Sequence, residues 1–124
     1  MARILVIDDE LEVVKLYNDF LTKEGFKVLA TSSGEDGLNL AKKELPDLIL
    51  LDVMMPGIDG GEIAYNLLKH PATRNIPVIF LTGILSHEEE LGAESGLGKR
   101  LFLSKTSNIK EILKKINDVL GMRD

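Results

Sequence analysis

The chain has 124 residues, of which 44% are hydrophobic and 28% are charged, and its formal net charge is -5. These values predict one domain over residues 1–124, and the negative charge argues against a nucleic-acid-binding surface spread over the whole chain. The sequence has no cysteine, which excludes disulfides, thiolate catalysis and cysteine-based zinc sites and suits a cytoplasmic location. No apolar run approaches the length that inserts into a membrane.

Five short apolar segments, rich in β-branched residues, are predicted to form buried β-strands. In chain order they are Ile4–Ile7, Val28–Thr31, Leu48–Leu51, Val78–Leu81 and the weaker Leu101–Leu103. Glycine or proline stands shortly before three of these segments, at Gly25, Pro46 and Pro77, and favours a turn at each place.

Between these strands, apolar residues recur with the period of an amphipathic helix. The four apolar faces comprise Val13, Leu16, Tyr17, Phe20 and Leu21; Leu38, Ala41 and Leu45; Ile63, Ala64, Leu67 and Leu68; and Ile109, Ile112, Leu113 and Ile116. A further helix is expected over Ser86–Gly98, and its three glycines should make it the least stable of the set. Pairs that resemble capping boxes indicate helix starts at Asp9 with Glu12, Ser33 with Asp36, Ser86 with Glu89, and Asn108 with Glu111.

The alternation of strands and helices predicts an α/β sandwich with a five-stranded parallel sheet and helices on both faces. In such a sheet, functional groups collect beyond the carboxyl ends of the strands. Polar residues stand at four of these ends, namely Asp8-Asp9, Asp52, Thr82 and Ser104-Lys105. Three carboxylates, a hydroxyl and an ammonium group are therefore expected at one edge of the sheet.

This set of side chains can perform phosphoryl chemistry. Three neighbouring carboxylates repel one another unless a cation lies among them, and Mg²⁺ prefers hard oxygen ligands of this kind. A carboxylate beside Mg²⁺ can attack phosphorus and form an aspartyl-phosphate, with Lys105 offsetting charge and Thr82 donating a hydrogen bond. Taken singly, each residue is an ordinary solvated or strand-terminal side chain. Their shared position at one edge favours a functional site.

Four motifs make the chain resemble the receiver domain of two-component response regulators over nearly its full length. They are Ile7-Asp8-Asp9-Glu10, the run 51–60 (LDVMMPGIDG), Leu81-Thr82-Gly83 and Ser104-Lys105. The resemblance implies a doubly wound, flavodoxin-like fold with helices on both faces and the strand order 2-1-3-4-5, as in the chemotaxis receiver. It also implies a phosphorylation switch that changes its partner-binding face and catalyses only its own phosphorylation and slow dephosphorylation.

The resemblance assigns a role to each site residue. Asp52 is the implied phosphoacceptor, and Asp8, Asp9, Asp52 and the backbone carbonyl of Met54 are the implied Mg²⁺ ligands. Thr82 is the hydroxyl expected to move toward the phosphoryl group, and Lys105 the cation expected to bridge to it. Phe102 occupies the position of the family's rotating aromatic residue, although an ordinary core phenylalanine is an equal alternative.

Two further residues, Met54 and Ile84, correspond to the positions that border the path of the attacking water in receiver domains. Both are apolar and sizeable, so they are expected to exclude water and to slow the loss of phosphate. The family usually has proline after its lysine, whereas this chain has Thr106. The Lys105–Thr106 peptide is therefore predicted to be trans.

The resemblance implies a sensor histidine kinase or a histidine phosphotransfer protein as the phosphoryl donor. It further implies a cytoplasmic protein that is a monomer or a phosphorylation-dependent dimer, without direct nucleic-acid binding or membrane insertion. The sequence stops after its last predicted helix, so no output domain is expected within it. The downstream target is not encoded in any recognisable motif.

Three other functions remain open at this point. A flavin-binding module shares the fold class, but Asp8-Asp9-Glu10 would repel a phosphate after the first strand. An aspartyl-phosphate-forming phosphatase usually has a second carboxylate two residues after its nucleophile, where this chain has Met54. An interaction module that no longer uses phosphate is the third, and the complete chemical set argues against it.

Overall fold

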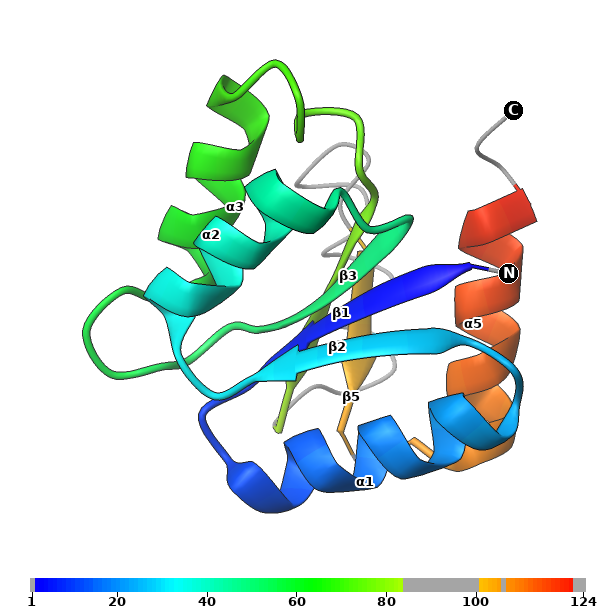
Figure 1. Cartoon of the computed structure of the whole chain (residues 1–124). Helices are drawn as coiled ribbons and strands as arrows, with labels where there is room; N and C mark the ends of the chain where they lie inside the picture. Colours follow the sequence, from blue (N-terminus) through cyan, green and yellow to red (C-terminus); the bar gives the residue numbers. More distant parts are fainter. Residues whose placement is uncertain (1, 84–100, 106, 122–124) are drawn as a thin grey trace.

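The computed structural model describes residues 2–83, 101–105 and 107–121. Within these residues five strands form one parallel sheet in the order β2-β1-β3-β4-β5, which confirms the expected topology (Figure 1). The elements are β1 (Arg3–Ile7), α1 (Leu11–Lys23), β2 (Lys27–Thr31), α2 (Gly34–Glu44), β3 (Leu48–Asp52), α3 (Gly60–Lys69), β4 (Val78–Thr82), β5 (Leu101–Ser104) and α5 (Ile109–Gly121). The helix expected over Ser86–Gly98 lies outside the described residues.

Helices cover both faces of the sheet, as the alternation of elements predicted. Helices α2 and α3 lie on one face and α1 and α5 on the other (Figure 1). Because successive side chains of a strand point to opposite faces, each buried strand contributes to both cores. In β3, for example, Leu48 and Leu50 pack with α1 and α5, whereas Ile49 and Leu51 pack with α2 and α3.

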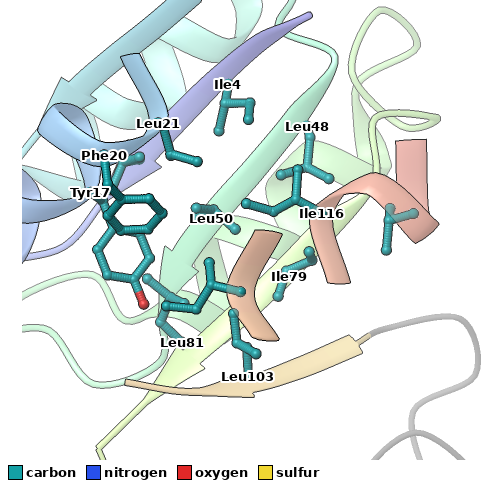
Figure 2. Close-up of a cluster of buried hydrophobic side chains, with 13 residues drawn as sticks. Ile4, Tyr17, Phe20, Leu21, Leu48, Leu50, Ile79, Leu81, Leu103 and Ile116 are labelled. Carbon is teal, nitrogen blue, oxygen red and sulfur yellow. The ribbon is translucent and has the colours of Figure 1, made fainter. Parts of the chain in front are cut away.

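The core beneath α1 and α5 is a cluster of buried apolar side chains from two helices and four strands (Figure 2). Tyr17, Phe20 and Leu21 of α1 and Ile112, Ile116 and Val119 of α5 pack against β1, β3, β4 and β5. The apolar face of α5 therefore extends one turn beyond the predicted stripe. This core fixes α1 and α5 next to the strand ends that carry the polar residues.

Two of the predicted capping interactions are confirmed and one is wrong. The Ser33 hydroxyl accepts a hydrogen bond from the Asp36 amide, and Asn108 and Glu111 cap each other reciprocally at the start of α5. Helix α1 instead has Glu10 as its N-cap, without a side-chain cap, so the predicted pairing of Asp9 with Glu12 is wrong. Asp9 lies one residue too early because the loop after β1 is longer than predicted.

Several residues assigned to the apolar helix faces are exposed rather than buried. These are Leu16 (54% exposed), Leu68 (50%), Ile109 (46%) and Leu45 (50%). The first three lie at the edges of their stripes, where one side of the side chain meets solvent. Leu45 has a different cause, because α2 has ended at Glu44 and Leu45 adopts a left-handed conformation with φ of 47°.

The left-handed backbone of Leu45 predicts a stabilising substitution. A Cβ in this conformation costs about 1–2 kcal/mol, whereas glycine adopts it readily at a helix C-terminus. We therefore expect Leu45→Gly to raise the free energy of unfolding by about 0.5–1 kcal/mol, after the loss of a half-exposed side chain is deducted. Urea unfolding monitored by circular dichroism measures the change.

Gly25 provides the matched control for this prediction. It has φ of 97°, and a Cβ built there meets nothing within 4 Å, so only backbone strain opposes a side chain. Gly25→Ala should therefore destabilise the protein by about 1 kcal/mol. A destabilised Leu45→Gly variant would show that the contacts of Leu45 outweigh its backbone strain.

Candidate functional site

The register of the parallel strands brings the predicted site residues to one edge of the sheet. Ile7 pairs with Leu51, Asp52 with Leu81, and Thr82 with Ser104. The ladder continues past the strand ends, because the Asp8 amide donates to the Thr31 carbonyl and the Lys105 amide to the Thr82 carbonyl. The side chains that follow β1, β3, β4 and β5 therefore start from neighbouring backbone positions, as the sequence predicted.

Asp8, Asp9 and Asp52 form a compact acidic cluster at this edge. One carboxylate oxygen from each lies within 4.8 Å of the others. Asp8 is fully buried and Asp52 is 3% exposed, whereas Asp9 faces solvent. With the carboxylates ionised, Oδ2 of Asp52 is buried without a hydrogen-bond donor among the described residues. A buried carboxylate oxygen without a donor favours a cation as its partner.

A close approach of α3 to the end of β3 holds Asp52 in place. The Gly60 amide donates to the Val53 carbonyl, and Asp59 caps α3 by accepting a hydrogen bond of 2.8 Å from the Glu62 amide. A Cβ at Gly60 would collide with the carbonyl oxygen of Asp52 and lie 2.9 Å from Cα of Val53. Glycine is therefore required where the helix start meets the backbone of Asp52.

Lys105 is the cation that faces the acidic cluster. Its Nζ lies 2.9 Å from Oδ2 of Asp8, 3.3 Å from Oδ1 of Asp52 and 2.8 Å from Oε1 of Glu10. Its side chain is 13% exposed, so its contacts with the buried Asp8 and Asp52 are little screened by solvent, whereas Glu10 is 61% exposed. The same Oδ1 of Asp52 also accepts a hydrogen bond from the Met54 amide at 3.3 Å.

Burial and like charge shift the proton affinity of the site. Burial, hydrogen bonding with Asp9 and the negative charge of Asp8 raise the pKa of Asp52 to about 7, although Lys105 opposes them. Burial lowers the pKa of Lys105, but the contacts with Asp8 and Glu10 outweigh it and raise the pKa above its ordinary value. Lys105 therefore stays charged, whereas the positive charge beside Asp52 does not fully offset what disfavours its ionised form.

The donor set of this cluster fits Mg²⁺. It offers three carboxylates, which are hard oxygen ligands, and Asp52 has an oxygen that no described donor satisfies. The exposed Asp9 leaves one side of the cluster open to solvent, and Mg²⁺ characteristically retains several water ligands. Asp8, Asp9 and Asp52 are thus the residues that would hold the ion.

The remaining predicted residues have clear positions where the structure describes them. Thr82 ends β4 and is partly buried. Phe102 is partly buried in β5 and stacks on Phe80, with ring centroids 5.1 Å apart. Met54 is 78% exposed beside Asp52. Ile84 and the Lys105–Thr106 peptide lie outside the described residues.

The sequence analysis gave no role to Glu10, Gly60 or Tyr17, although all three adjoin the site. Glu10 contacts Lys105, and Gly60 contacts the backbone of Asp52. The Tyr17 hydroxyl is buried, and the protein's interior raises its pKa to about 12 through burial and the charge of Asp8. A third acidic residue after Asp8-Asp9 was the available signal for Glu10. The place of Tyr17 under the site depends on tertiary packing.

Comparison with known proteins identifies the family. A model described as the response regulator receiver domain matches residues 4–117. The chain belongs to this family. Receiver domains are the phosphoacceptor switches of two-component signalling, and this membership excludes the flavin-binding alternative.

Relatives and solved structures agree with this assignment. Protein PilH of Pseudomonas aeruginosa is 37% identical, and the match covers 98% of this chain and 99% of PilH. Response regulator PleD of Caulobacter vibrioides is 43% identical, but the match covers 84% of this chain and only 23% of PleD. The crystal structure of Vibrio cholerae chemotaxis protein CheY4 superposes with a TM-score of 0.84 at 27% identity, covering 96% of this chain and 98% of CheY4.

Among the helices that the structure describes, none combines the length and the apolar character that a membrane crossing requires.

The raised pKa of Asp52 predicts how pH affects the metal-free receiver domain. Because the folded state binds this proton more tightly than the unfolded state, stability falls as pH rises from about 3.8 to about 7. Asp52→Asn should remove the penalty and raise the free energy of unfolding by about 1–3 kcal/mol at pH 8, with little gain near pH 4. Urea titrations in the presence of a chelator measure this difference.

Asp19→Asn is the control, because Asp19 is an exposed aspartate of α1 away from the cluster. Its effect should be small at every pH. A gain from Asp52→Asn that is equal at pH 4 and pH 8 would contradict the assignment of the penalty to the buried charge.

Proposed function

We propose that this receiver domain accepts a phosphoryl group on Asp52 from a histidine kinase or a histidine phosphotransfer protein, in a Mg²⁺-dependent reaction. The observation that carries the proposal is the position of Asp52, a carboxylate buried at the strand ends with Lys105 3.3 Å away and Asp8 and Asp9 beside it. This arrangement combines a nucleophile, a fixed cation and a set of metal ligands.

In the proposed reaction, a carboxylate oxygen of Asp52 attacks the phosphorus in line with the bond to the donor histidine nitrogen. The new oxygen–phosphorus bond forms as the phosphorus–nitrogen bond breaks, and the electron pair of that bond stays on the imidazole. Lys105 remains protonated and offsets the charge of the phosphoryl oxygens. The Met54 amide donates to Oδ1 of Asp52 and so fixes the orientation of the carboxylate.

Asp8, Asp9, Asp52 and the backbone carbonyl of Met54 would hold the metal ion. When bound, Mg²⁺ would neutralise the carboxylates and polarise the phosphoryl oxygens. The chain's contribution is to place these ligands before the reaction, since Asp8 is held by the strand ladder and by the Glu10 amide, which donates to its Oδ1 at 2.9 Å.

The output of the switch would begin at Thr82 and Phe102. The Thr82 hydroxyl would bond a phosphoryl oxygen, and the resulting shift at the end of β4 would alter the packing of the neighbouring β5. Phe102 pairs with Phe80 across these two strands and stacks on its ring. A change in that stack would alter the face presented to a partner, as a monomer or as a phosphorylation-dependent dimer, in the cytoplasm beside the kinase.

Phosphorylation of Asp52 is directly testable. Incubation with acetyl phosphate and Mg²⁺ should increase the intact mass by one phosphoryl group, and Asp52→Asn should abolish the increase because the amide is a poor nucleophile. Asp59→Asn is a matched control, since Asp59 is an exposed carboxylate in the same loop that caps α3 instead. Persistent labelling of the Asp52→Asn variant would overturn the assignment.

The lifetime of the phosphorylated state gives a second test. The apolar Met54 borders Asp52, and Ile84, a residue outside the described part of the structure, is its expected counterpart. If both exclude water, Met54→Asn combined with Ile84→Glu should speed the loss of phosphate by about tenfold, equivalent to about 1.4 kcal/mol in the barrier. Single-turnover dephosphorylation measures the rate, and an unchanged rate would contradict the shielding.

A further inference from the structure

Glu10 occupies a constrained position between the acidic cluster and α1. It is the N-cap residue of α1, and its carbonyl accepts hydrogen bonds from the amides of Val13 and Val14. Its amide donates to Oδ1 of Asp8. The backbone of Glu10 is therefore fixed on both sides, by the helix and by the cluster. Its side chain forms no cap and is free to extend elsewhere.

The Glu10 side chain extends to Lys105, at the end of a different strand. Oε1 of Glu10 lies 2.8 Å from Nζ of Lys105, which is the shortest of the three ion pairs of that lysine. The contact joins the loop after β1 to the loop after β5, across 95 residues of sequence. Glu10 is 61% exposed at this contact, whereas its partner is 13% exposed.

Three carboxylates of the described residues surround the ammonium group of Lys105, and its contact with Glu10 is a hydrogen bond. An ammonium group has three N–H bonds, and Nζ of Lys105 has three carboxylate neighbours, in Asp8, Glu10 and Asp52. A phosphoryl group on Asp52 would require a donor from the same Nζ. One of the existing contacts of Lys105 must then be released. The contact that is lost most easily is the one whose carboxylate can bind water in place of Lys105.

We propose that Glu10 is a positioning residue that holds Lys105 in the unphosphorylated state and releases it when a phosphoryl group occupies the site. Asp8 is fully buried, so it would lose its counter-charge without gaining water. The exposed Glu10 carboxylate is rehydrated as soon as Lys105 leaves it. Glu10 thus competes with the phosphoryl group for one N–H bond, and this competition weakens phosphoryl binding. The inference rests on the proposed function of Asp52.

The test measures binding of beryllofluoride, a tetrahedral mimic of the phosphoryl group, in the presence of Mg²⁺. Glu10→Gln removes the charge, and Glu10→Asp keeps the charge but shortens the side chain so that it no longer reaches Nζ. Both variants should bind beryllofluoride about twofold to fivefold more tightly than wild type in ¹⁹F NMR titrations. Glu12→Gln, which removes an exposed charge from the first turn of α1, should bind like wild type.

Each outcome decides between distinct explanations. Equal tightening by Glu10→Gln and Glu12→Gln, without tightening by Glu10→Asp, would mean that loss of any nearby negative charge strengthens beryllofluoride binding. That result would overturn the proposal of a specific contact. Unchanged or weaker binding by both Glu10 variants, with thermal unfolding like that of wild type, also overturns it. These results leave the role of Asp52 intact. Only a wild-type protein that neither binds beryllofluoride nor takes up phosphate would overturn the proposed function as well.

Discussion

Two carboxylates, Asp8 and Asp52, are buried side by side at the carboxyl edge of the sheet, with Lys105 between them as the balancing cation. Burial of like charges is costly, and a single lysine compensates it only partly, as the raised pKa of Asp52 shows. The architecture around the site maintains this arrangement. The order of the strands places β1 beside β3 and separates β3 from β5 by β4 alone, so three loops distant in sequence supply the charges.

Most of the fold was predictable because it depends on local patterns of side chains. Strands buried on both faces appear as continuous apolar runs, and their predicted bounds differ from the structure by at most one residue at either end. The same patterns located Asp8, Asp52, Thr82 and Lys105 at one edge, since parallel strands end together. The features that the sequence did not predict depend on tertiary packing. The contact of Glu10 with Lys105 and the exposure of Leu16 depend on how the elements meet in space.

The loop between β3 and α3 was recognised in the sequence as a motif, but the structural roles of two of its residues were not predicted. Its glycine at position 60 was noted only as part of a family motif, whereas the structure gives it a physical reason in the backbone of Asp52. Asp59, in the same motif, caps α3 and was not predicted to do so. One short segment therefore supplies Asp52, the Met54 amide that donates to it and the helix start that supports them.

The sheet divides the interior into two separate hydrophobic cores, one beneath α1 and α5 and the other beneath α2 and α3. Among the described residues, no buried residue belongs to both clusters, because strand side chains alternate between the faces. Substitutions in different cores should then combine almost additively in their effect on stability. Evolution can consequently remodel one face for a new partner while the other stays unchanged.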